Sequence, residues 1–140
     1  MSECLTFEYQ VPGDDFTRAG EASSSVKNKL KMMGVDSGAI RRVAIAMYEG
    51  EINMVIHAGG GAIKVMVTDD NIRIILADTG PGIPDVEKAM QLGYSTAPEE
   101  VRSLGFGAGM GLPNMKRNAD AFFITSQPGA GTDIRMEFGI

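Results

Sequence analysis

The chain has 140 residues, of which 44% are hydrophobic and 22% charged, a balance typical of a globular domain with its own core. The net charge of −5 argues against sequence-independent binding to nucleic acid, because repulsion from phosphates is not offset. One cysteine, Cys4, excludes an internal disulfide, and no apolar run is long enough for a membrane span. We therefore expect a cytoplasmic protein in which residues 1–140 form a single domain.

The first half of the chain predicts one strand and two helices. Residues 4–11 alternate apolar and polar side chains, as a half-buried strand does. Residues 16–34 predict a helix that ends at a glycine. Residues 38–58 predict a second helix, capped by Asp36 or Ser37. This second helix is apolar on nearly all sides, so we expect it to lie buried between a sheet and other helices.

The second half predicts two pairs of strands and a short helix. Residues 62–68 and 72–78 form the first pair, and residues 121–127 and 132–138 form the second. Residues 112–119 predict the short helix. Three helices that cover one face of a mixed sheet make an α/β two-layer sandwich, which is the fold class we expect.

A long irregular segment, residues 79–111, lies between the two pairs of strands, and such segments in compact domains are usually functional. It follows directly on Asp78, which ends a predicted strand, and it begins with Gly80 and Gly82. A carboxylate accepts a hydrogen bond from an exocyclic amine such as that of adenine, and glycines let a flat ring approach the backbone. An ordinary Gly/Pro turn remains the alternative interpretation.

The same segment ends with four glycines at alternate positions, directly before the short helix: Gly105, Gly107, Gly109 and Gly111. Successive free N–H groups at a helix N-terminus form an anion site, and glycines let phosphates reach the backbone. The pattern is not the dinucleotide fingerprint, because no strand directly precedes it, and it lacks the lysine of a Walker A loop. Taken alone, the glycines also fit a merely flexible loop.

Two polar side chains share one face of the long, apolar helix: Glu49 and Asn53 lie four residues apart. The carboxamide oxygen of Asn53 suits Mg²⁺, and Glu49 suits a general base that activates a hydroxyl or a water. Glu51 is a second carboxylate nearby, but it points in another direction around the helix. His57 continues the row as a candidate phosphate contact. Each of these residues, taken singly, is also explained by hydrogen bonds within the fold.

In combination and in this order, the motifs resemble those of the GHKL ATPases. They are Glu49…Asn53 on a helix, Asp78-x-Gly80-x-Gly82 after a strand, Gly107-x-Gly109-x-Gly111 before a helix, and Gly131-Thr132 at the last strand. This superfamily includes gyrase and the histidine kinases and shares the Bergerat ATP-binding fold. The resemblance covers nearly the whole chain. It implies binding of ATP or ADP, with Mg²⁺ on Asn53, adenine on Asp78 and Thr132, and a lid over the phosphates at residues 105–111.

Within the superfamily, the chain most resembles small bacterial anti-sigma factors and switch-protein serine kinases. Residues 93–100 and 109–117 are similar to the lid and the glycine box of those proteins. The resemblance implies an ATP-dependent serine/threonine kinase that phosphorylates an anti-anti-sigma (STAS-type) protein, with Glu49 as base, or that acts as an anti-sigma factor on a sigma factor, or does both. Arg18 is the implied partner contact, and a homodimer is compatible with the resemblance. The lysine found in the lid of some relatives is replaced here by Ala97.

Two other functions stay open at this stage. In a nucleotide-gated binding module, ATP or ADP sets the lid and the lid sets the affinity for a partner, without phosphorylation. The chain also fits the ATPase part of a sensor kinase, although the strand and helix before the Asn-bearing helix disfavour it. A phosphate added to the partner protein distinguishes the kinase from the binding module.

Overall fold

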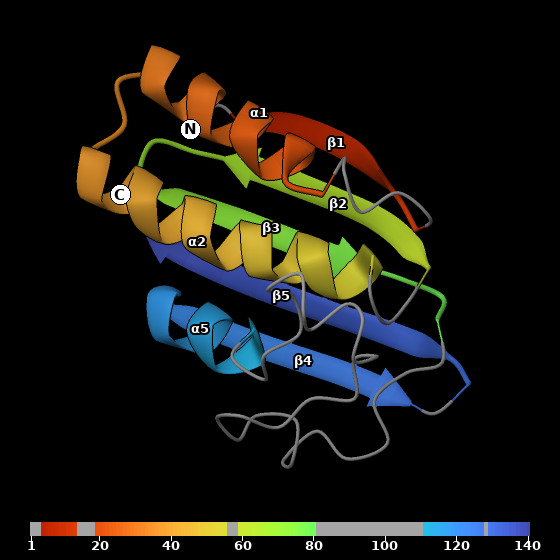
Figure 1. Cartoon of the computed structure of the whole chain (residues 1–140). Coiled ribbons are helices and arrows are strands. Elements are labelled where there is room, and N and C mark those ends of the chain that lie inside the picture. The colour runs from red at the N-terminus through yellow and green to blue at the C-terminus, as the bar shows by residue number, and fades with distance from the viewer. Residues whose placement is uncertain (1–3, 14–18, 56–58, 81–110, 128) are drawn as a thin grey trace.

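The computed structural model describes residues 4–13, 19–55, 59–80, 111–127 and 129–140. These residues form a five-stranded sheet with helices packed on one of its faces, as Figure 1 shows. The predicted α/β two-layer sandwich is therefore confirmed. Within the described part of the chain, no helix is both long enough and apolar enough to cross a membrane.

The sheet consists of five strands in the spatial order β1-β2-β3-β5-β4. Their bounds are Leu5–Pro12 for β1, Gly60–Val67 for β2, Asn71–Ala77 for β3, Ala121–Gln127 for β4 and Gly131–Gly139 for β5. Every neighbouring pair among the strands of the described residues is antiparallel, so the expectation of a mixed sheet is wrong for this part of the chain. Tight hairpins join β2 to β3 and β4 to β5. Between β1 and β2 the chain runs through α1 and α2, which point in opposite directions, so β2 runs antiparallel to β1.

Three helices form the second layer of the described structure. They are α1 (Glu21–Met32), α2 (Ser37–Asn53) and α5 (Gly111–Asn118). The longest of them, α2, lies in the middle of the layer and contacts α1 on one side and α5 on the other (Figure 1). The expected burial of α2 between the sheet and the other helices is confirmed.

Two helix ends differ from the sequence-based expectation. Gly20 occupies the N-cap of α1 with φ 101°, so that helix begins at Glu21 rather than near residue 16, and residues 14–18 lie outside the described part. The α-helical part of α2 ends at Asn53, and Met54 and Val55 continue as a π-helical turn. Such wide turns are frequent at functional sites. Residues 56–58, the last of the predicted helix, lie outside the described part of the chain.

The core lies between the inner face of the sheet and the three helices. Its fully buried members include Leu30 of α1, Met47 of α2 and Phe138 of β5. Gly50 lets α2 approach the sheet closely, because a Cβ at this position would overlap the side chain of Leu76 in β3. This contact explains why a residue with poor helix propensity stands in the middle of a long helix.

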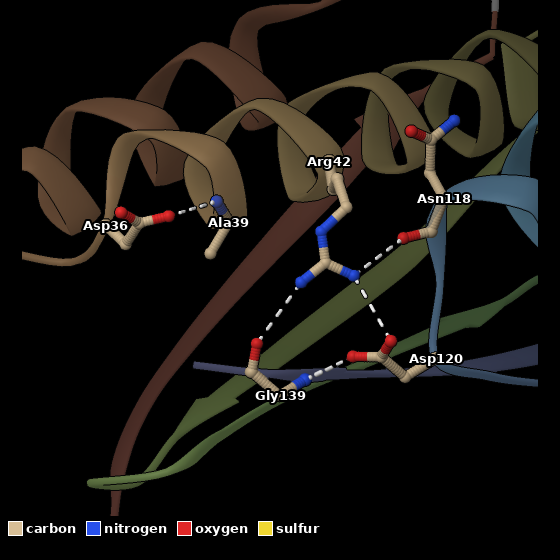
Figure 2. A network of polar contacts seen from close by, with 6 residues as sticks. All are labelled: Asp36, Ala39, Arg42, Asn118, Asp120 and Gly139. Atoms are coloured by element: carbon tan, nitrogen blue, oxygen red, sulfur yellow. Dashed lines mark hydrogen bonds and ion pairs between the residues drawn. The ribbon is translucent and has the colours of Figure 1, made fainter.

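A polar network joins α2 to the end of β5 and to the turn after α5 (Figure 2). The Arg42 guanidinium donates to Asp120 Oδ1 at 3.3 Å, to the Asn118 carbonyl at 3.4 Å and to the Gly139 carbonyl at 3.3 Å. The Gly139 amide donates to Asp120 Oδ2 at 2.6 Å. This hydrogen bond is the main cause that lowers the pKa of Asp120 below its ordinary value. Desolvation opposes it, and the charge and hydrogen bond of Arg42 add smaller lowering effects.

Candidate nucleotide-binding site

Asp78 stands directly after β3, where backbone amides fix its carboxylate. Its Oδ1 accepts hydrogen bonds from the Gly80 amide at 3.0 Å and from the Thr132 amide at 3.2 Å. The Asp78 amide in turn donates to the Thr132 carbonyl at 3.0 Å. No hydrogen bond links Oδ2 to another residue of the described part of the chain. The carboxylate is thus oriented through one oxygen, and the other oxygen suits an acceptor for a ligand.

Thr132 brings a hydroxyl next to this carboxylate. Thr132 is 8% exposed, and its Oγ1 lies 2.8 Å from Ser126 Oγ on the neighbouring strand. The Ser126 hydroxyl donates to the Gly131 carbonyl at 3.2 Å, which holds the pair of hydroxyls in place. A fixed acceptor beside a hydroxyl matches the edge of adenine, which carries an amine donor next to a ring-nitrogen acceptor.

Glycines on both neighbouring strands bring the backbone close to Asp78. A Cβ on Gly61 of β2 would lie 2.6 Å from the Ala77 carbonyl oxygen and 3.1 Å from Asp78 Cβ. A Cβ on Gly131 of β5 would overlap the Asp78 carbonyl oxygen, and the φ of Gly131 is +91°. Side chains at these two positions would push the neighbouring strands away from Asp78. The glycines therefore shape the surroundings of the carboxylate.

Glu49 faces the third helix. Its side chain is half-buried, and its Oε1 accepts a hydrogen bond from Asn114 Nδ2 of α5 at 3.4 Å. Asn53, one turn further along α2, is also half-buried. No hydrogen bond of the Asn53 side chain to another described residue is present, so its carboxamide oxygen suits a cation. A hard cation that takes its other ligands from phosphates and water needs only one such oxygen from the protein.

Two contacts place the end of α2 over the end of β3. Gly50 packs on Leu76, two residues before Asp78. Met54, directly after Asn53, reaches Gly61, because a Cβ on Gly61 would lie 3.2 Å from Met54 Cε. The helix that carries Glu49 and Asn53 therefore ends over the edge of the sheet where Asp78 and Thr132 lie. No cluster of three or more His, Cys, Asp or Glu residues suited to a metal occurs among the described residues.

Glu51 has a different environment from Glu49. It is 2% exposed, and its carboxylate accepts hydrogen bonds from three backbone amides at the start of α1. Side chains two residues apart along a helix point in clearly different directions, as helical geometry predicts, so Glu51 faces α1 while Glu49 faces α5. Of the two carboxylates, Glu49 is therefore the one that faces α5, near the expected phosphate loop.

The remaining predicted site residues are less completely defined. Gly111 is the first residue of α5. The other predicted residues, which are Arg18, His57, Gly82, Gly105, Gly107 and Gly109, lie outside the described part of the chain. The structure also adds Ser126 and Gly61, and it adds Asn114, which lies within the stretch 109–117 but is not itself a predicted site residue. Only the run Gly59-Gly60-Gly61 hints at Gly61, and that run is equally expected at a helix end.

Comparison with known proteins identifies the family. The model for the histidine kinase-, DNA gyrase B- and HSP90-like ATPases matches residues 38–139. The chain belongs to this ATPase family. This ATPase is 35% identical over 113 residues to the serine/threonine-protein kinase RsbT of Bacillus subtilis, a match that covers 78% of the chain and 79% of the relative. It is 37% identical over 138 residues to the anti-sigma F factor of Thermoanaerobacter sp. strain X514, covering 94% and 89%.

Solved structures support the fold of this ATPase. The mycobacterial sensor histidine kinase MprB matches with a TM-score of 0.53 at 16% identity, over 96% of the chain and 97% of that protein. A chain of the SiaB–SiaC complex from Pseudomonas aeruginosa matches with a TM-score of 0.55 at 12% identity, over 97% and 89%. The predicted GHKL resemblance is confirmed, as is the likeness to switch-protein kinases and anti-sigma factors. Membership of the family implies ATP binding.

Proposed function

We propose that this ATPase is a cytoplasmic serine/threonine kinase that phosphorylates an anti-anti-sigma (STAS-type) protein, with residues 1–140 acting as one domain. The main support is the 35–37% identity, over most of both chains, to proteins named as a serine/threonine-protein kinase and an anti-sigma F factor. We include binding of a sigma factor in the proposal, because the chain resembles anti-sigma factors as closely as it resembles the kinase.

The nucleotide is ATP, bound through its adenine by Asp78 and Thr132. The support is the carboxylate held by two amides beside a buried threonine, which offers an acceptor and a hydroxyl to the adenine edge. Asn53 provides the protein ligand for Mg²⁺, which when bound offsets the charge of the phosphates. Gly80 and Gly82 leave room for the adenine ring. The glycines of residues 105–111, together with His57, contact the phosphates.

Glu49 is the general base of the transfer. It accepts the proton of the serine hydroxyl while the serine oxygen forms a bond to the γ-phosphorus. The bond between that phosphorus and the bridging oxygen breaks, and ADP leaves. The hydrogen bond from Asn114 orients the Glu49 carboxylate, which is otherwise only half-buried. Glu51 cannot take this role, because its carboxylate is occupied by the amides of α1.

Replacement of Glu49 tests the proposal. The protein is incubated with Mg-ATP and a purified STAS-type domain, and phosphate on that domain is measured by intact mass. We expect Glu49→Gln to lower the transfer rate about 100-fold or more, the usual share of a general base. ATP affinity should stay at the wild-type value. Glu8→Gln, an exposed carboxylate on β1, is the matched control. Transfer at the normal rate by Glu49→Gln would contradict the assignment of the base.

The second candidate is a nucleotide-gated binding module without kinase activity. It is favoured by the relatives named anti-sigma F factor, since a name of that kind describes binding. The same experiment separates the two functions. A STAS-type domain whose affinity depends on the nucleotide, and whose mass does not change, supports the module and contradicts the kinase. Arg18 is a proposed partner contact under either function, and a homodimer is compatible with both.

A further inference from the structure

The start of α1 is held by a carboxylate from another helix. Glu51 Oε2 accepts hydrogen bonds from the amides of Gly20 at 2.9 Å and Ala22 at 3.1 Å. Glu51 Oε1 accepts one from the amide of Ser23 at 3.0 Å. The first amides of a helix have no partners within the helix and carry partial positive charge, so a buried carboxylate satisfies and stabilises them.

A helix does not need a distant residue merely to begin. Asp36 caps α2 locally, because its Oδ2 accepts hydrogen bonds from the amides of Gly38 at 3.0 Å and Ala39 at 3.2 Å. The N-cap of α1 is Gly20, which has no side chain for this purpose. The amides at the start of α1 therefore donate to Glu51 of α2, and these hydrogen bonds fix the position of the first turn of α1 relative to α2.

Glu51 belongs to the part of α2 that carries the proposed chemistry, between Glu49 and Asn53. A second contact joins the start of α1 to this part of α2. Gly20 packs against the ring of Tyr48, because a Cβ on Gly20 would lie 3.0 Å from Tyr48 Cε2. Tyr48 directly precedes Glu49 and is 40% exposed. The start of α1 and the residue before the proposed base thus form one continuous surface.

An open groove extends from this surface along α1. Its lining includes Ser24, Asn28 and Met32 of α1, the N-cap residue Gly20, and Tyr48 of α2. Met32 at the far end is 89% exposed. A partner protein seated in this groove would contact α1 and Tyr48, the residue that directly precedes Glu49.

We propose that Glu51 is a positioning residue for phosphotransfer, which fixes the first turn of α1 relative to Glu49 so that the serine of the docked partner meets the base. This inference rests on the proposed function. Loss of the Glu51 carboxylate releases the first turn of α1, whereas Asp78, directly after β3, and Thr132 of β5 keep their hydrogen bonds to each other. Recognition of the partner is therefore weakened, and binding of ATP is not.

Glu51→Gln tests this proposal, because it keeps the size of the side chain but replaces one acceptor oxygen by a donor that faces backbone amides. Kinetics with a STAS-type domain and Mg-ATP give KM and kcat for the partner, and calorimetry gives the Kd of ATP. We expect the KM for the partner to rise about tenfold, the equivalent of one lost hydrogen bond to a charged group, while the Kd of ATP stays unchanged. The control Asp36→Ala removes the cap of α2 and should change neither constant.

An unchanged KM for the partner in Glu51→Gln, or equal losses of partner and ATP binding, overturns the inference. If that variant does not fold, Tyr48→Ala tests the same surface at a partly exposed position, and an unchanged KM there overturns it equally. A wild-type protein that binds the STAS-type domain without phosphorylating it contradicts only the kinase, and the Kd of the partner then replaces KM. A wild-type protein that binds no STAS-type domain overturns both proposals.

Discussion

The amide of Thr132 donates to Asp78 Oδ1 at 3.2 Å, although 54 residues separate the two in the sequence. The Asp78 amide returns a hydrogen bond to the Thr132 carbonyl, so the end of β3 and the start of β5 hold each other. This exchange orients one oxygen of the Asp78 carboxylate and fixes the backbone of Thr132 next to it.

Asp78→Asn tests the recognition of adenine. Asparagine keeps one oxygen that can accept from the amides of Gly80 and Thr132. Its NH₂ group, however, is a donor and would face the amine of adenine, which is also a donor. We expect the Kd of ATP to rise about 10–100-fold, because a donor facing a donor leaves both unpaired. Calorimetry measures the change. Asp133→Asn, the neighbouring exposed aspartate of β5, is the matched control and should leave the Kd unaltered. Equal affinities in Asp78→Asn and wild type would exclude Asp78 from the adenine site.

Gly131→Ala tests the close approach of β5 to Asp78. Gly129 provides a matched control, because its φ is +79° and a Cβ there meets no atom within 4 Å, whereas a Cβ on Gly131 would overlap the Asp78 carbonyl. We expect Gly129→Ala to cost about 1 kcal/mol of unfolding free energy through backbone strain alone. Gly131→Ala should cost a further 1–3 kcal/mol, roughly, from overpacking. Denaturant titration measures both, and equal costs would show that the contact with Asp78 is unimportant.

Asn114→Ala tests whether α5 orients the proposed base. The 3.4 Å hydrogen bond is long, so we expect a loss of about tenfold in kcat rather than abolition, with the Kd of ATP unchanged. Asn118→Ala is the control on the same helix, because its side chain donates to the Asn114 carbonyl at 2.8 Å and does not bond Glu49. A kcat equal to that of the wild type in Asn114→Ala would mean that Glu49 is oriented without α5.

Gly50→Ala tests the packing of α2 on β3. The added methyl group meets Leu76, which is 2% exposed and confined by the core. We expect a net loss of about 1–2 kcal/mol of unfolding free energy, since the overpacking outweighs the gain in helix propensity. The double variant Gly50→Ala with Leu76→Val makes room for the methyl group, so the two changes should cost less together than the sum of their separate costs. Strict additivity would rule out the contact.

Asp120→Asn tests a contribution to stability that depends on pH. The Gly139 amide and the Arg42 guanidinium lower the pKa of Asp120 from its ordinary 3.8. Because the folded pKa is the lower one, the carboxylate stabilises the fold above about pH 4, and this contribution disappears as the pH falls through the folded pKa. We expect Asp120→Asn to lose about 0.5–1 kcal/mol of unfolding free energy at pH 7.

The difference between Asp120→Asn and wild type should then shrink as the pH is lowered below about 4, because both side chains become neutral. Unfolding titrations across the acid range measure this change. Asp69→Asn, an exposed position in the turn between β2 and β3, serves as control and should show no such trend. A difference that is the same at neutral and acid pH would exclude the charge of Asp120 as its cause.

The sequence by itself determined the local structure and the identity of the main polar residues. Alternating apolar residues predicted the strands, and the apolar helix with Glu49 and Asn53 was recognisable because residues four apart share a helical face. Asp78 was identifiable because it ends an apolar strand and is followed by glycines. These features depend only on neighbours along the chain.

The tertiary structure alone decided how distant segments meet. The amide of Thr132 fixes Asp78, Asn114 reaches Glu49, and Glu51 holds the first turn of α1. It also decided that all neighbouring strands in the described sheet are antiparallel. For β1 and β2 the reason is that the chain reverses three times between them, into α1, into α2 and into β2. Contacts of this kind depend on packing between elements, and a pattern within one element does not record which element will lie opposite it.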